Sequence, residues 1–103
     1  MSKFDYMNFS DGDSDIEFVV NAKKFTKKQA LEFFKEENEG CEDRLNFDKL
    51  NIDIIKEKTV RYYPKYPGYS GFDSDNEGGY TYCGKGERGS FPVWVIEFDD
   101  LVN

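Results

Sequence analysis

A glycine-rich stretch at residues 84–89 comes closest to a known chemical motif, since its letters fit the pattern G-x-G-x-x-G. In dinucleotide-binding proteins this loop opens a helix whose N-terminal amides receive the pyrophosphate. Residues 90–94 instead predict a strand, so the dinucleotide interpretation fails. A kinase glycine loop does join two strands, but this chain is too short for a kinase and lacks the other kinase motifs. What remains is a hairpin loop in which Lys85 and Arg88 could hold a phosphate or a carboxylate, or an ordinary glycine-rich turn.

An acidic stretch at residues 73–78 resembles the first half of a calcium-binding loop, with oxygen-bearing side chains at alternate positions followed by a glycine. The last position of such a loop should be a bidentate glutamate, and here it is Gly84. The acidic run at 11–15 fits less well, because Ile16 stands where the glycine belongs. The sequence therefore predicts a solvated acidic turn at 73–78 and no metal or other cofactor, with adventitious calcium binding left open.

Residues 61–69 form the densest aromatic and basic stretch of the chain. Rings interleaved with Arg and Lys suit base stacking combined with phosphate contact. The same composition suits a protein-binding hot spot, and half of these tyrosines could simply belong to the core. The candidate partner-binding or ligand-binding residues of this stretch and of the glycine-rich loop are Arg61, Tyr62, Tyr63, Tyr66, Tyr69, Lys85 and Arg88.

The chain contains no histidine. Histidine is the usual general base near neutral pH, the usual partner of a Ser or Cys nucleophile and the commonest metal ligand, so three large classes of enzyme lose support together. A pair of carboxylates, as in glycoside hydrolysis, stays possible, but no spacing in the sequence indicates which pair. We therefore expect no catalytic residue and no enzymatic activity.

The net charge of -7 predicts that nucleic acids and anionic membranes are repelled and that partners are basic or neutral. The acid is concentrated in residues 1–22, 73–77 and 93–103, whereas the rest of the chain carries a net positive charge. If these three segments converge in space, they form a carboxylate-lined surface able to occupy a site meant for phosphate. The candidate partner-binding residues on that surface are Asp11, Asp13, Asp15, Glu17, Asp73, Asp75, Glu77, Glu97, Asp99 and Asp100.

The elements that must position these residues follow from local patterns. Thr26 and Gln29 form a capping box, which predicts a helix over 27–38. Runs of β-branched and aromatic residues predict strands at 17–20, 60–63, 80–83 and 93–98, with a hairpin loop at 84–90 between the last two.

Residues 45–55 fit both a strand and a helical face, and we favour a short helix or turn that enters a strand. The expected fold is α+β, a small antiparallel sheet of three to four strands with one or two helices packed on one face. A single domain over 1–103 is expected from the length, with 1–15 as an arm or an edge strand.

The chain shows neither a signal peptide nor a long apolar run, and Cys41 and Cys83 lack CxxC spacing, so we expect reduced thiols and a cytoplasmic protein. Its bias toward Lys, Asn, Ile, Phe and Tyr, with few alanines, is typical of AT-rich genomes, such as those of low-GC bacteria and their phages. In size, acidity and lack of catalytic residues the chain resembles anti-CRISPR and other anti-defence proteins, a resemblance of type that rests on no motif.

The expected function is that of a small acidic inhibitor, a phage-encoded nucleic-acid mimic of the anti-CRISPR type. It would act in the bacterial host cell by presenting carboxylates to a basic protein, a nucleic-acid-processing enzyme. No direct contact with nucleic acid or membrane is expected. The alternative is a module that binds a nucleotide or another small phosphate ligand through the loops at 84–89 and 61–69. A carboxylate-pair enzyme and a housekeeping or virion interaction module also stay open.

Overall fold

A computed structural model of the chain describes residues 5–10, 12, 15–40, 43–64, 70–75 and 77–102. Among the residues named above, those outside these ranges are Asp11, Asp13, Cys41, Tyr66 and Tyr69. The helix is α1 (Lys27–Glu37) and the strands are β1 (Tyr6–Ser10), β2 (Asp15–Asn21), β3 (Lys56–Pro64), β4 (Gly71–Ser74), β5 (Tyr80–Gly84) and β6 (Gly89–Glu97).

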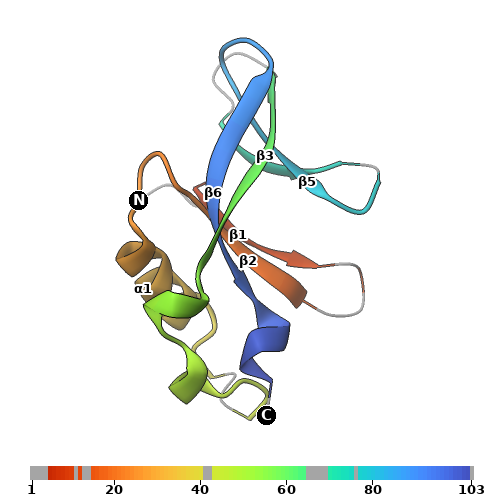
Figure 1. Cartoon of the computed structure of the whole chain (residues 1–103). Helices are drawn as coiled ribbons and strands as arrows, with labels where there is room; N and C mark the ends of the chain where they lie inside the picture. Colours follow the sequence, from red (N-terminus) through yellow and green to blue (C-terminus); the bar gives the residue numbers. More distant parts are fainter. Residues whose placement is uncertain are drawn as a thin grey trace.

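The strands form one sheet in the order β1-β2-β6-β3-β5-β4. All neighbouring pairs are antiparallel except β3 and β5, which run parallel. The edge strands β1 and β4 approach each other, so the sheet curls into a nearly closed barrel. In Figure 1 the β1–β2 hairpin and the loop before β5 project to the same side of the long β3–β6 pair, and α1 lies on the other side.

Strands β2 and β6 are buried on both faces, which explains their nearly continuous apolar sequence. Successive side chains of a strand point to opposite faces of a sheet. On β6, Val93 and Val95 therefore pack in the barrel interior, whereas Ile96 packs against the layer that contains α1. On β2, Val19 faces the interior and Phe18 faces the helix, and neither is exposed to solvent. Two apolar clusters thus share the same two strands.

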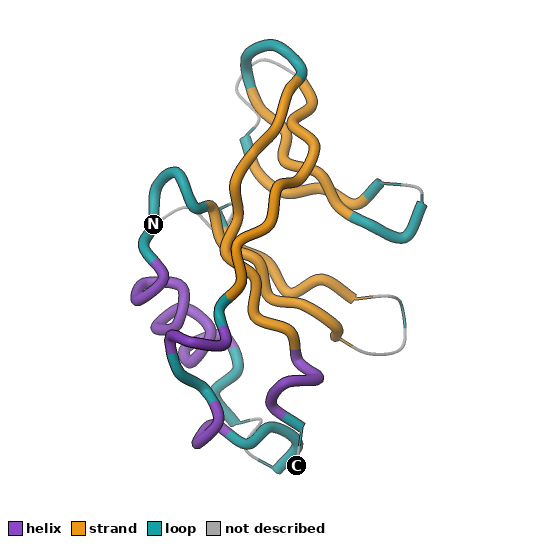
Figure 2. The backbone as a smooth tube through the Cα atoms, viewed as in Figure 1, coloured by secondary structure: helices purple, strands orange, loops and turns teal. Residues whose placement is uncertain are grey.

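The local predictions of the helix and of the 45–55 region are confirmed. Thr26 Oγ1 accepts a hydrogen bond from the Gln29 amide, and Gln29 Oε1 accepts one from the Thr26 amide, so the capping box is complete. Two short 3-10 turns, Phe47–Lys49 and Ile52–Ile54, lead into β3. Figure 2 shows the helical segments in the lower half of the molecule, with α1 beside the strands and the turn Phe98–Leu101 at the end of β6.

The predicted fold class, an antiparallel sheet of three to four strands with helices on one face, is wrong. Within the described residues the sheet has six strands, and its second face closes around an aromatic interior instead of staying open. β4 was missed as a strand because it is short and carries polar residues, which hide the alternating pattern, whereas β1 lies within residues 1–15, expected as an arm or an edge strand, and is an edge strand. The parallel pairing of β3 with β5 leaves no local trace in the sequence.

The predicted hairpin at 84–90 is also wrong. β5 and β6 do not pair with each other, because β3 lies between them in the sheet. The connection from Gly84 to Gly89 therefore crosses the end of β3, and it brings Lys85 to the same end of the barrel as the turn that follows β2.

Candidate functional site

The antiparallel pairing of β2 and β6 gives the barrel two ends of opposite charge. β2 begins at Asp15 and β6 ends at Glu97, and Glu17 lies directly opposite Glu97 in the register. Asp75, in the loop between β4 and β5, lines the same cavity as Glu17, about 410 Å³ in volume. We call this part of the barrel the acidic end: Glu17, Glu97 and Asp75 lie together there, Lys56 links Asp100 to Glu97, and Asp15, Asp73, Glu77 and Asp99 are their neighbours along the chain.

Cations of β3 pair with part of this acid. Lys56 Nζ lies 2.9 Å from Glu97 Oε2 and 3.5 Å from Asp100 Oδ2, and the hydrogen bond to Glu97 raises the pKa of Lys56. Lys58 Nζ lies 3.9 Å from Glu17 Oε1. Arg61 lines the same cavity as Glu17, so cations of β3 offset part of the negative charge of the acidic end.

Tyr80 places an unpaired hydroxyl at the acidic end. Its side chain lines the cavity with Glu17 and is 7% exposed, and its Oη has no hydrogen-bond partner among the described residues. Burial raises the pKa of Tyr80, and the nearby Glu17 carboxylate raises it further, through its charge and through a hydrogen-bond contact too loose to satisfy the hydroxyl. Because a buried hydroxyl without a partner is costly, this group can gain a hydrogen bond from a polar molecule that enters the cavity.

The acidic loop at 73–78 closes on itself. Asp75 Oδ1 accepts hydrogen bonds from the amides of Glu77, at 2.9 Å, and Gly79, at 2.7 Å. These bonds lower the pKa of Asp75, with that from Gly79 contributing most. The described part of the chain contains no group of three or more side chains placed to hold a metal ion. The hydrogen bonds of Asp75 within this turn thus explain the acidic spacing that resembles a calcium-binding loop.

The basic end of the barrel is the opposite end, where β2 finishes and β6 starts. A cavity of about 400 Å³ there is lined by Lys23 and Lys24 of the turn after β2, and by Lys85 of the β5–β6 connection. The rings of Tyr62 and Phe91 form part of its wall. Three cations from two separate segments thus converge on one cavity.

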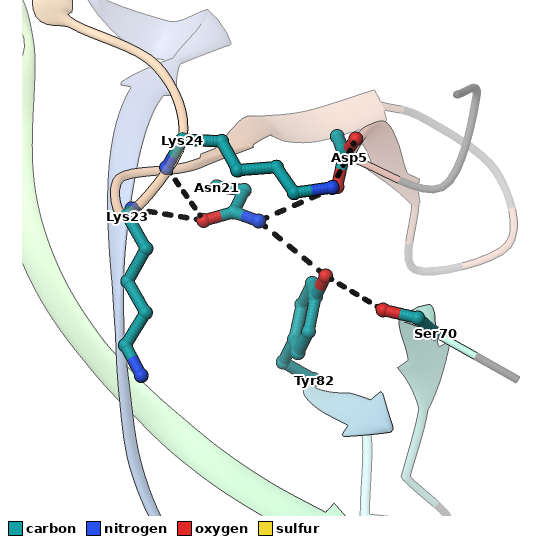
Figure 3. A network of polar contacts seen from close by, with 6 residues as sticks. All are labelled: Asp5, Asn21, Lys23, Lys24, Ser70 and Tyr82. Carbon is teal, nitrogen blue, oxygen red and sulfur yellow. Dashed lines mark hydrogen bonds and ion pairs between the residues drawn. The ribbon is translucent and has the colours of Figure 1, made fainter. Parts of the chain in front are cut away.

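Asn21 organises the floor of this cavity (Figure 3). Its Oδ1 accepts hydrogen bonds from the backbone amides of Lys23, at 2.8 Å, and Lys24, at 3.3 Å. Its Nδ2 donates to Asp5 Oδ1 at 3.3 Å and to Tyr82 Oη at 3.4 Å. Asn21 is 2% exposed, so these bonds fix both the side chain and the turn that carries the two lysines.

Comparison of the chain with protein-family models, curated proteins and solved structures found no match. No helix in the described ranges is long and apolar enough to cross a membrane. The function must therefore be inferred from the two ends of the barrel.

The aromatic and basic candidates separate onto two faces. Tyr62 and Lys85 lie at the basic-end cavity. Arg61 and Tyr63 line a different cavity, of about 370 Å³, and the guanidinium carbons of Arg61 and Arg88 lie 5.7 Å and 4.7 Å from the Tyr63 ring centroid. The described residues of this stretch, 61–64, therefore supply two surfaces, because neighbouring strand residues point to opposite faces.

The glycine motif has a packing role. A Cβ at Gly84 would lie 2.9 Å from Tyr62 Oη, and Gly86 has a φ of +127°, which favours glycine. The Tyr62 hydroxyl donates a hydrogen bond to the Lys85 carbonyl, which fixes the connection against the Tyr62 ring. The glycines let the backbone approach Tyr62, and that approach positions Lys85.

The sequence analysis did not select Asn21, Lys23, Lys24 or Tyr80 as site residues. An Asn-x-Lys-Lys segment directly after a strand was a visible signal for an Asx turn carrying two cations. No local signal pointed to Tyr80, since its unpaired hydroxyl depends on side chains of β2 and β3.

Proposed function

We propose that this protein binds a basic protein through the acidic end of its barrel. The observation that supports the proposal is the proximity of carboxylates from three separate parts of the sequence, β2, β6 and the loop between β4 and β5. Glu17 and Glu97 are strand neighbours there, and Asp75 shares a cavity with Glu17. Such a surface attracts a positively charged groove and accelerates association at low salt.

The partner in this proposal is a nucleic-acid-processing enzyme of a bacterial host, and binding inhibits it. Carboxylates of the acidic end occupy positions that phosphate groups would otherwise take, and the Tyr80 hydroxyl offers a further hydrogen bond near Glu17. The proposed setting is the host cytoplasm, with the protein acting as a phage-encoded anti-defence protein of the anti-CRISPR type. Inhibition by occupancy needs no catalytic residue.

The test compares two triple variants with the same change in charge. Glu77→Gln, Asp99→Asn and Asp100→Asn remove exposed carboxylates of the acidic end, whereas E32Q, E36Q and E39Q remove exposed carboxylates of α1 and the turn after it. Each protein is immobilised and used to capture nucleic-acid enzymes from a low-GC bacterial lysate, and the captured enzyme is assayed for nucleic-acid binding.

We expect the wild-type and α1 variants to capture the same enzyme and to block its nucleic-acid binding. The acidic-end variant should lose both effects, and raised salt should weaken capture by all three proteins. Equal capture by both triple variants, or capture without competition against nucleic acid, would contradict the proposal.

A further inference from the structure

The cavity at the basic end has the composition of a small-molecule site. Its volume of about 400 Å³ lies in the usual range for ligand pockets. It combines aromatic walls with a few polar groups, and its lining residues come from four segments: Asn21, Lys23, Lys24, Tyr62, Tyr82, Lys85, Gly86, Glu87, Gly89, Ser90 and Phe91.

The charge of this cavity is unbalanced. Lys24 pairs with Asp5 at 3.4 Å, but Lys23 and Lys85 have no carboxylate partner among the described residues. The Lys23 ammonium lies over the Phe91 ring instead, 5.2 Å from its centroid. Glu87 is the one carboxylate in the lining. Asp5 and Glu87 offset only part of the charge of the three lysines, and the positive charge that remains attracts an anion, even in a protein whose net charge is -7.

The groups around the cavity are held in place before any ligand arrives. Asn21 fixes the backbone of Lys23 and Lys24, and the Tyr62 hydroxyl fixes the backbone of Lys85. Tyr82 closes the floor, since its hydroxyl also lies 3.1 Å from Ser70 Oγ. Fixed surroundings reduce the entropy that binding must overcome.

We propose that the basic-end cavity binds a phosphate-bearing small molecule the size of a mononucleotide. Lys23, Lys24 and Lys85 surround the phosphate, since lysine ammonium groups are common phosphate ligands. The organic part of the ligand lies against the exposed part of the Tyr62 ring. The two lysines without a carboxylate partner match the two charges of a phosphate monoester. This proposal is independent of the acidic end and of the protein partner proposed there.

The experiment is a calorimetric titration with inorganic phosphate, a nucleoside 5′-monophosphate and a short single-stranded oligonucleotide. Lys23→Gln combined with Lys85→Gln removes the two unpaired cations. The matched control is K28Q combined with K35Q, which makes the same change in net charge on the exposed surface of α1.

We expect the monophosphate to bind the wild-type and control proteins at one saturable site. The K23Q and K85Q variant should bind it about tenfold more weakly or worse, because two charge-assisted contacts are lost. Inorganic phosphate should bind more weakly than the monophosphate and depend on the same two lysines.

Four outcomes would overturn the proposal. Equal weakening in both variants, or no binding at all, would mean that the lysines do not form a site. Equal affinity for inorganic phosphate and for the monophosphate would show that the organic part of the ligand contributes nothing to binding. Stronger, steeply salt-dependent binding of the oligonucleotide would identify a nucleic-acid surface instead. The K23Q and K85Q variant keeps the acidic end, so its capture of a basic enzyme tests the proposed function separately.

Discussion

Tyr80 and Tyr82 stand two residues apart on β5 and point their rings into the same barrel, yet their hydroxyls meet different surroundings. Tyr82 Oη, at the basic end, accepts a hydrogen bond from Asn21 and contacts Ser70 Oγ. Tyr80 Oη, at the acidic end, has no partner within the described part of the chain. The two ends therefore differ in more than charge. At the basic end the buried side chains of Asn21 and Tyr82 are hydrogen-bonded. At the acidic end the buried Tyr80 hydroxyl can gain a hydrogen bond from a binding partner.

The largest effect on stability is expected from removal of the Asn21 side chain, which forms hydrogen bonds at the basic end. In Asn21→Ala the backbone amides of Lys23 and Lys24 lose a hydrogen-bond acceptor, and the side chains of Asp5 and Tyr82 lose a hydrogen-bond donor. We expect the free energy of unfolding, measured by urea denaturation, to fall by about 2–4 kcal/mol.

The control for that variant is Asn51→Ala. Asn51 is exposed and caps a short turn through the Asp53 amide, so its loss should cost about 1 kcal/mol or less. A loss of stability in Asn21→Ala no larger than in the control would show that the floor of the basic end is not a stabilising network.

Smaller effects on stability are expected when either tyrosine of β5 loses its hydroxyl. Tyr82→Phe removes a hydroxyl that is hydrogen-bonded, so we expect the free energy of unfolding to fall by about 1–2 kcal/mol. Tyr80→Phe removes an unpaired buried hydroxyl and should leave stability unchanged or raise it by up to about 1 kcal/mol. Urea denaturation of both variants at neutral pH measures the difference, and the opposite order would contradict the contrast between the two ends.

The smallest effect concerns alkaline pH. The pKa of Tyr80 is raised in the folded protein, by burial first and by Glu17 second, so the unfolded chain releases this proton at a lower pH than the folded one. The neutral hydroxyl therefore contributes its full stabilisation below the pKa of the unfolded chain, about 10. This contribution to the free energy of unfolding falls as the pH rises from there toward the pKa of the folded protein. Between about pH 9 and pH 11 the wild-type protein should lose stability faster than Tyr80→Phe. Parallel curves of unfolding free energy against pH would show that Tyr80 ionises equally easily in both states.

Local patterns predicted several features of the fold correctly. The capping box of Thr26 and Gln29 predicted the helix, because its hydrogen bonds join residues only three apart. The mixed pattern at 45–55 led to the two turns before β3. The uneven distribution of acid was visible too, since charge is additive along the chain.

The sequence predicted several residues of the candidate sites but not which of them lie together. Asp75 and Glu17 were selected as acidic residues, but nothing in the sequence indicated that they share a cavity with Lys58 and Arg61. The glycine-rich loop was selected for its cations, yet Lys85 shares a cavity with Lys23 and Lys24, which lie about sixty residues earlier in the chain.

The sequence by itself determined the helix, most of the strand positions, the net negative charge and the lack of histidine, because each depends on residue type or on contacts within one turn. The tertiary structure alone decided the strand order, the parallel β3–β5 pair and the closure of the sheet. These depend on register between segments far apart. The antiparallel register of β2 and β6 converted the charge of separate segments into an acidic and a basic end.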